Sequence, residues 1–210
     1  MKKKFIARRI ALLLSLVFLL FNFSCRTQAF TAAQTATIEK PKISEIQSDS
    51  IKKVLESAVA QIKITTGYDP NYIVIPYPSG DVKPETGVCS DVVIRAFRHA
   101  GVDLQKEVHE DMQTNFAAYP AKRGLKSPDT NIDHRRVPSL QTFFTRRGKS
   151  LPITNNAEDY KPGDVVAWDL DGKGMTHIGI VSNLWNEPIK RYSIIHNIGG
   201  GVVLIFICSF

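Results

Sequence analysis

The sequence predicts an α+β domain in which helices come first and an antiparallel sheet follows. Apolar residues recur at helical spacing in stretches that lie before residue 148. After residue 160, short β-branched runs alternate with turns that contain Gly, Pro and Asp. Helices followed by strands are the pattern of an α+β domain. The 210 residues suit one such domain behind a targeting segment, and we place the domain at residues 46–210.

Residues 1–24 have the pattern of a signal peptide. Five bases and no acid precede Cys25, and these bases are Lys2, Lys3, Lys4, Arg8 and Arg9. The apolar run at 10–23 is too short and too clearly flanked for a membrane span. We therefore expect an exported protein, and we expect residues 25–45, which include a stretch rich in Thr, Ala and Gln, to form a tether.

The signal sequence leaves two cleavage sites open. Ser24-Cys25 after the apolar run resembles the end of a lipoprotein signal, which would make Cys25 the lipidated N-terminus. Asn22 stands where such signals usually carry an aliphatic residue, and cleavage after Ala29 or within residues 31–33 is the alternative. We expect a protein that is periplasmic or a membrane-anchored lipoprotein, with no membrane contact beyond the signal peptide or a lipid on Cys25.

The formal charge of +7 does not indicate a nucleic-acid partner. Five of the positive charges lie in the signal peptide, and the rest of the chain carries 22 bases against 20 acids. We therefore expect no binding of nucleic acid. The sequence also contains no metal-binding or cofactor-binding signature, so no cofactor is expected.

A first amphipathic helix is expected at residues 48–63. Its apolar residues follow the i, i+3, i+4, i+7 pattern, and Gly67 stops it. A short extended run at 72–75 and a turn at 77–81 then lead toward Cys89. We expect this helix to serve as scaffold.

A second helix is expected to begin at or next to Cys89. Val92, Val93 and Ala96 recur at helical spacing, and Gly101 stands where a left-handed C-terminal cap would. A thiol at the first turn faces unpaired backbone N–H groups and the positive end of the helix dipole, which both favour the reactive thiolate. A lone cysteine is also commonly a small buried hydrophobe. The sequence leaves open whether Cys89 is free or paired with Cys208.

Two polar stretches follow this helix. A helix over about 104–116 contains His109-Glu110-Asp111, whose three side chains point in different directions and are expected to form a solvated face. The loop at 124–138 is rich in charge, either because Asp–Arg pairs tie a solvated loop or because Arg135 or Arg136 grips a substrate carboxylate. A short helix over 138–144, closed by a glycine, follows.

Three β-branched runs predict the strands of the sheet: 164–168, 177–181 and 192–196. If the last two form a hairpin with a symmetric loop, Val181 faces Tyr192 and His177 faces His196, with Cβ atoms about 5 Å apart. Asn197 then falls on the opposite face, so that His196 is the partner of His177. A one-residue bulge would reverse that choice.

Cys89, His177 and His196 could supply the three roles of a cysteine hydrolase. A cysteine nucleophile needs an imidazole to take its proton, and that imidazole needs a third polar group to fix its tautomer and orientation. The alternative is that each histidine is a hydrogen-bonded structural residue of the sheet.

Four sequence motifs carry a specific resemblance. They are Gly87-Val-Cys-Ser-Asp91, Pro162-Gly-Asp-Val-Val-Ala-Trp168, His177-Ile-Gly-Ile-Val181 and Ile195-His196-Asn197. Their order resembles that of the cysteine, Gly-Asp, His-x-Gly and final histidine motifs of NlpC-type papain-like cell-wall peptidases. From about Gly67 to Gly200 the chain is more closely similar to domain-of-unknown-function family 1287, exported bacterial proteins assigned to that superfamily.

The resemblance implies a papain-like α+β fold with a Cys-bearing helix packed on an antiparallel sheet. It implies that Cys89 is the nucleophile, His177 the base and His196 the orienting residue. A tyrosine near the oxyanion is expected as well, either Tyr77 or Tyr68. The expected oxyanion and substrate-binding set is Tyr77, Asp91, Arg135 and Arg136. The chain departs from the family in its apolar end at 200–210, which is either a buried strand or a foreign tail.

These observations lead to an expected function. The chain is expected to be an exported cysteine hydrolase that cleaves an amide bond in peptidoglycan stem peptides through an acyl-thioester. One alternative is a non-catalytic cell-envelope binding module that binds through the loop at 133–136. The other is a thiol acyltransferase, which would pass the acyl group to an amine or alcohol.

Overall fold

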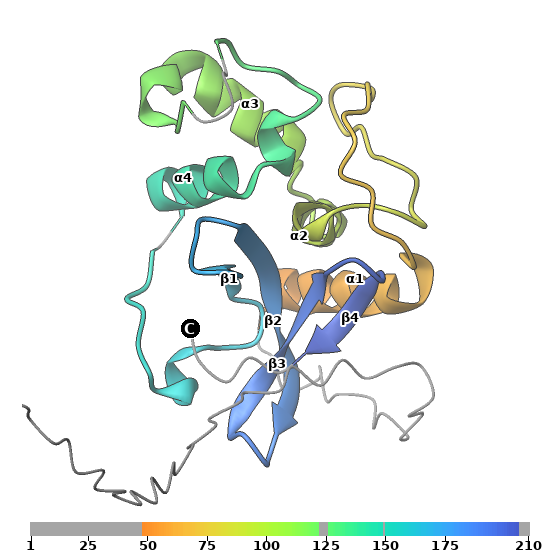
Figure 1. Ribbon diagram of the computed structural model, residues 1–210, viewed down its shortest axis with the longest axis vertical. Coiled ribbons are helices and arrows are strands. Elements are labelled where there is room, and N and C mark those ends of the chain that lie inside the picture. Colours follow the sequence, from red (N-terminus) through yellow and green to blue (C-terminus); the bar gives the residue numbers. More distant parts are fainter. Residues whose placement is uncertain (1–47, 122–125, 149, 206–210) are drawn as a thin grey trace, which may run out of the picture.

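The computed structural model describes residues 48–121, 126–148 and 150–205, in which helices cover one face of a four-stranded antiparallel sheet (Figure 1). The helices are α1 (Asp49–Ile64), α2 (Cys89–His99), α3 (Leu104–Asn115) and α4 (Val137–Arg147), with short 3-10 turns η2 (Phe116–Ala118), η4 (Asp133–Arg135) and η5 (Ala157–Asp159). The strands are β1 (Val165–Asp169), β2 (Thr176–Asn186), β3 (Arg191–Asn197) and β4 (Val202–Ile205). The predicted α+β class is confirmed, whereas the signal peptide, Cys25 and the tether lie outside the described residues.

Helix α1 forms where the amphipathic pattern predicts it. The Ser48 hydroxyl accepts the backbone N–H of Ile51 and caps the first turn. Leu55 and Ala58, one turn apart, are fully buried against the rest of the core. Within the described ranges, no helix combines the length and the apolar character needed to cross a membrane.

Helix α2 begins at Cys89, and its N-terminus is capped from inside the helix. The residue before it, Val88, has no side-chain oxygen, but the Asp91 carboxylate accepts the backbone N–H of Val88 at 2.6 Å. Gly87 has a φ of +152°, and a Cβ there would lie 2.9 Å from Asp91 Oδ2. The glycine therefore lets the chain approach this carboxylate. Gly101 follows the helix with a φ of +91°, as predicted for the cap.

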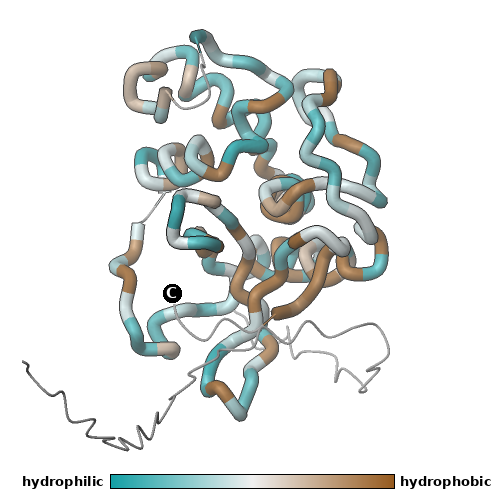
Figure 2. Tube along the Cα trace, viewed as in Figure 1, coloured by the Kyte–Doolittle hydropathy of each residue, from teal (hydrophilic) through white to brown (hydrophobic). Residues whose placement is uncertain are grey.

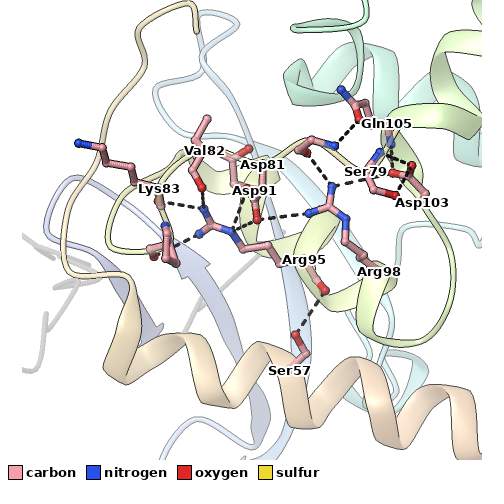
Figure 3. A network of polar contacts seen from close by, with 12 residues as sticks. Ser57, Ser79, Asp81, Val82, Lys83, Asp91, Arg95, Arg98, Asp103 and Gln105 are labelled. Atoms are coloured by element: carbon pink, nitrogen blue, oxygen red, sulfur yellow. Dashed lines mark hydrogen bonds and ion pairs between the residues drawn. The ribbon is translucent and has the colours of Figure 1, made fainter. Parts of the chain in front are cut away.

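The C-terminal half of α2 holds the loop that leads to Cys89 (Figure 3). Arg95 Nε donates to the Asp81 carboxylate at 2.9 Å, and Arg98 donates to the same carboxylate at 3.2 Å. The Arg95 guanidinium also donates to the carbonyl oxygens of Val82, Lys83 and Thr86. A single planar cation thus fixes several turns of irregular backbone against the helix.

The sheet has the order β1-β2-β3-β4, with neighbours antiparallel throughout. The predicted hairpin register is wrong by two residues near the histidines, where Val181 pairs with Ile194, and by four residues near the loop, where Tyr192 pairs with Trp185. The strands extend further than predicted and contain a bulge between Val181 and Trp185. A shift of two residues keeps every side chain on its predicted face, so the choice of His196 is unaffected.

The two faces of the sheet have different partners. Ile178, Ile180 and Ile195 pack with the helices in the main core. The opposite face carries a smaller cluster of Val166, Val181 and Ile194, against which aromatic residues of the same face pack. Figure 2 shows β4 as an uninterrupted hydrophobic stretch, and this strand pairs with β3 and closes the sheet, as expected of a strand. Residues 206–210 lie outside the described part of the chain.

The predicted solvated face at His109-Glu110-Asp111 is wrong for two of its three residues. His109 is buried, and its Nδ1 lies 3.1 Å from the Asp133 carboxylate. Asp111 is buried as well, where it accepts Arg146 Nε and the Tyr119 hydroxyl, both at 2.7 Å. Only the glutamate between them is exposed. The partners come from later segments of the chain, which the helical pattern alone does not reveal.

Candidate active site

Cys89 lies in a pocket at the head of α2. Its side chain is 5% exposed and lines a cavity of about 440 Å³ together with Tyr68, Ile132 and Arg136. Its thiol is free, and Cys208, its possible disulfide partner, lies outside the described residues. The sulfur reaches the sheet at the backbone of Ile178, in strand β2, which runs beside α2 (Figure 1). The predicted meeting of helix and sheet at this cysteine is therefore present.

The electrostatic state of the thiol differs from the prediction. Burial raises the pKa of Cys89 to about 11. Hydrogen bonding by the backbone of Ile178 and Ser90 acts in the opposite direction, as expected at a helix N-terminus, but it is the smaller effect. The resting sulfur is therefore a neutral thiol at neutral pH. The helix position was expected to favour the thiolate, and desolvation overrides it.

The structure brings His177 and His196 together. His177 Nε2 lies 2.7 Å from His196 Nδ1, and the two rings are nearly perpendicular, at 87°. Trp168 packs its edge or face against both rings, with its centroid 4.7 Å from that of His177. Burial lowers the pKa of His177 to about 4 and that of His196 to about 3, so both rings are neutral at neutral pH.

Gly179 makes the close approach of the two strands possible. A Cβ at this position would lie 2.8 Å from the Ile195 carbonyl oxygen and 3.1 Å from the His196 Cβ. Both distances are too short for an ordinary side chain. The glycine of the His-x-Gly motif thus leaves room for the second histidine beside the first.

The thiol and the imidazole pair are not hydrogen bonded and lie on different sides of strand β2, and neither histidine lines the pocket that contains Cys89. His177 directly precedes Ile178, the residue whose backbone contacts the sulfur. His177 shares its face of the sheet with Trp168 and His196, whereas Ile178 faces the helices. Among the described residues, none donates to or accepts from His177 Nδ1, and no hydrogen bond joins the sulfur to either ring. The structure therefore brings together two of the three predicted triad members, the histidines, and does not hydrogen bond Cys89 to either of them.

Of the two tyrosines considered for the oxyanion, the structure places Tyr68 in the pocket and Tyr77 elsewhere. Tyr77 packs edge-on against His109, with ring centroids 5.3 Å apart. Tyr68 lines the pocket with Cys89. The sequence analysis preferred Tyr77, and the structure corrects this preference, because Tyr68 and not Tyr77 lines the pocket. The sequence offered no signal to separate them, since both precede the cysteine in irregular backbone.

Asp91 and Arg135 form a buried ion pair, and Arg135 also lines the pocket with Cys89. Arg135 Nε and Nη2 donate to the two oxygens of Asp91, each at 3.0 Å. Arg135 also donates to the carbonyl oxygens of Asn71 and Asp69, and its own carbonyl accepts the Ser90 hydroxyl. The expected substrate-binding roles are replaced by an architectural one. The pair fixes the wall of the pocket to the head of α2.

Arg136 is the remaining member of the predicted substrate-binding set, and it lines the pocket with Cys89. It precedes α4, and its carbonyl oxygen accepts the backbone N–H groups of Ser139 and Leu140. Its side chain makes no hydrogen bond to any described residue, and Nη1 is buried without a partner. The guanidinium is therefore available to a ligand.

Asn197 is a residue of the site that the sequence did not indicate. It lies on the helix-facing side of β3, opposite to His196, as the alternation of side chains predicts. Its Nδ2 donates to the carbonyl oxygens of Gly67 and Gly87, each at 3.0 Å. Asn197 thus ties both loops that flank Cys89 to the sheet. Only long-range pairing could have revealed this, since the partners lie 130 and 110 residues away.

A second cavity adjoins the first. It has a volume of about 550 Å³ and is lined on one side by Gln141, Thr145 and Arg146 of α4. Pro120, Pro138 and Thr176 line both cavities. The two cavities are therefore adjacent.

Comparison with known proteins gives a family and no activity. The uncharacterized protein YijF of Escherichia coli (strain K12) is 52% identical over 161 residues, which cover 77% of this chain and 78% of that protein. No solved structure matches the chain. The family described as "Domain of unknown function (DUF1287)" matches residues 55–204, a segment that contains Cys89, both histidines and the whole sheet up to β4. On these two matches, the chain belongs to the DUF1287 family.

Proposed function

We propose that this protein is an exported cysteine hydrolase of the NlpC-type papain-like class, which cleaves an amide bond in peptidoglycan stem peptides. The observation that carries the proposal is the contact between the head of α2 and strand β2. It places a free thiol in a pocket, one residue from a hydrogen-bonded imidazole pair. The order of the motifs along the chain supports the class, and the signal-like N-terminus supports export.

The chemistry follows from the ring nitrogen that remains available. With Nε2 bound to His196, His177 has Nδ1 free to take the thiol proton. The sulfur of Cys89 then attacks the amide carbon, and the developing oxyanion is near the backbone N–H groups of Cys89 and Ser90 at the helix head. His177 returns the proton to the leaving amine, which departs and leaves an acyl-thioester. Water attacks the thioester, His177 takes its proton, and the carboxylic acid and thiol are released.

The sulfur contacts the Ile178 backbone and the His177 ring lies on the other face of β2, so the proposal requires both Cys89 and the start of β2 to rearrange when substrate binds. The neutral thiol and neutral imidazole fit a mechanism in which proton transfer accompanies attack. His196 holds the His177 ring in one orientation and selects its tautomer.

A non-catalytic binding module is the second candidate. The 5% exposure of Cys89, its raised pKa and the missing hydrogen bond to His177 favour this candidate. Of the loop residues expected to bind in that case, Asp133 and Arg135 are buried in internal contacts, whereas Arg136 lines the pocket with a side chain that makes no hydrogen bond to a described residue. An acyltransferase would share the acyl-thioester and differ only in the acceptor.

The test is digestion of purified muropeptides, followed by mass analysis. The wild-type protein is compared with Cys89→Ala and with Cys89→Ser, which keeps the size of the side chain. A hydrolase adds one water per bond cleaved and loses this activity in both variants, whereas an acyltransferase yields products extended by the acceptor. Identical product profiles for wild type and Cys89→Ala would contradict both the hydrolase and the acyltransferase. Binding of muropeptides without new products would favour the non-catalytic binding module.

A further inference from the structure

We propose that Arg136 binds a carboxylate group of the ligand beside Cys89. That this ligand is the substrate rests on the proposed function. The binding of a carboxylate by Arg136 can be tested separately. It narrows the substrate to amides that carry a free carboxylate within reach of the bond attacked. Such a residue determines specificity and takes no part in the proton transfers.

The first support is the place of Arg136 in the fold. It precedes α4, and its backbone carbonyl is fixed by two N–H groups of that helix, at 3.0 and 3.1 Å. Its neighbours Arg135 and Val137 are buried. The backbone of Arg136 is therefore fixed, and the residue lines the cavity that contains Cys89.

The second support is that the guanidinium has donors and no acceptor. A guanidinium carries five N–H donors, and the side chain of Arg136 donates to no described residue. Its Nη1 is buried without a hydrogen-bond partner. Leaving a charged donor buried and unpaired is unfavourable, and a carboxylate in the pocket would satisfy it with two parallel hydrogen bonds.

The third support is the charge of the pocket. None of the residues that line it is Asp or Glu, and the other arginine, Arg135, is neutralised by Asp91. Asp129 and Arg136 attract each other electrostatically, but Asp129 is hydrogen bonded to Tyr72 and Asn131 and forms no ion pair with Arg136. A single uncompensated positive charge matches a carboxylate better than a phosphate monoester, whose charge approaches two.

The test uses two alkylating reagents of similar size that differ in charge. Iodoacetate carries a carboxylate and iodoacetamide is neutral. In each reaction the Cys89 sulfur bonds to the CH₂ carbon, iodide leaves, and the thiol proton goes to solvent. The measured quantity is the rate constant for iodoacetate divided by that for iodoacetamide, obtained by mass analysis of the peptide that contains Cys89. This ratio is expected to fall about fivefold in Arg136→Gln, because a positive charge a few ångströms from the sulfur is removed.

Two further variants show whether the effect belongs to Arg136. Arg136→Lys keeps the charge and is expected to keep most of the wild-type ratio. Lys53→Gln removes the same charge from an exposed position on α1 and is expected to leave the ratio unchanged. A wild-type ratio in Arg136→Gln overturns the assignment, and so does an equal fall in Lys53→Gln.

A second measurement requires no reactive thiol. Backbone amide NMR signals from Arg136 to Ser139 are followed during titration with N-acetylalanine and with its neutral methylamide. Shifts with the acid alone, abolished in Arg136→Gln, are expected, and no shift with the acid or equal shifts with both compounds overturn the assignment. Neither measurement depends on turnover, so a failure to cleave muropeptides removes the hydrolase proposal and leaves the carboxylate site to be judged on its own results.

Discussion

At Cys89, two opposing influences act on one sulfur atom. Desolvation raises the thiol pKa to about 11, while the backbone of Ile178 and the first turn of α2 lower it. The net result is a thiol that stays protonated at neutral pH. Asp91 likewise has two roles, because its carboxylate caps the first turn of α2 and also neutralises Arg135.

The first prediction concerns the reactivity of Cys89 without substrate. Because the thiolate is the form that reacts, the rate of alkylation by iodoacetamide is expected to rise about tenfold per pH unit up to about pH 10. The measurement follows the mass of the peptide that contains Cys89 as a function of pH. A rate that is already constant between about pH 6 and 8 would show a thiolate–imidazolium pair and contradict the raised pKa.

The second prediction concerns the Asp91–Arg135 pair. Asp91→Ala leaves a guanidinium buried without its partner and is expected to lower the free energy of unfolding by about 3–5 kcal/mol, measured by urea denaturation. Asp91→Ala with Arg135→Met is expected to lose less than the sum of the single changes. In the exposed pair of Asp49 and Lys52, Asp49→Ala serves as control and is expected to change stability by less than about 1 kcal/mol. Equal effects of the two Asp→Ala changes would contradict the assigned role.

Among the elements, α2 is fixed at both ends by different means. Its head is tied to the 69–71 segment through Asp91 and Arg135, and its C-terminal half is tied to the preceding loop through Arg95. Its buried face packs on β2. The position of the thiol is therefore determined by the anchoring of a whole helix and by contacts on two of its sides.

The third prediction tests this anchoring. Arg95→Ala removes the hydrogen bonds to Asp81, to the Thr65 hydroxyl and to four carbonyl oxygens, and it is expected to lower the free energy of unfolding by about 2–4 kcal/mol. Arg95→Lys is expected to recover little, because an ammonium cannot reproduce the planar set of donors. Thermal and urea unfolding provide the measurement. Full recovery of stability in Arg95→Lys would show that charge alone matters.

The elements could be predicted where the signal is local. The start of α2 follows from the apolar spacing after Cys89, and the shared face of His177 and His196 follows from period two even though the bulge moved their pairing by two residues. Contacts between distant segments could not be predicted this way. Arg135 meets Asp91 across 44 residues, and Asn197 meets Gly87 across 110. Hydrophobic periodicity carries no information about such pairs.

Across the whole molecule, the sheet separates two environments. One face completes the main core with the helices, and the other carries the two histidines beside Trp168. A third histidine, His134, is buried in η4, and burial lowers its pKa to about 3. Three buried neutral imidazoles make the stability of the whole domain depend on pH.

The fourth prediction is a loss of stability in mild acid. As the pH falls below about 6.5, the unfolded chain binds protons on His134, His177 and His196, whereas the folded chain does not until about pH 4 to 3. The free energy of unfolding is therefore expected to fall between about pH 6.5 and 4, by up to about 1.4 kcal/mol per pH unit for each histidine. The raised pKa of Asp133 acts in the opposite direction, but it is one group against three.

Guanidinium denaturation at a series of pH values provides the measurement. His134→Gln is expected to reduce the slope of the free energy of unfolding against pH by the contribution of about one proton. His99→Gln, which changes an exposed histidine on α2, is expected to leave this slope unchanged. A flat profile between about pH 6.5 and 4 in the wild type would show that these rings are protonated in the folded state.

The burial of Cys89 also affects how long the sulfur survives. Peroxide attacks the thiolate, and a thiol with a pKa of about 11 presents almost none of it at neutral pH. With 5% of the side chain exposed, the same wall of residues that excludes water also slows the approach of an oxidant. The fold therefore favours the reduced form of this sulfur and slows its oxidation to sulfenic acid.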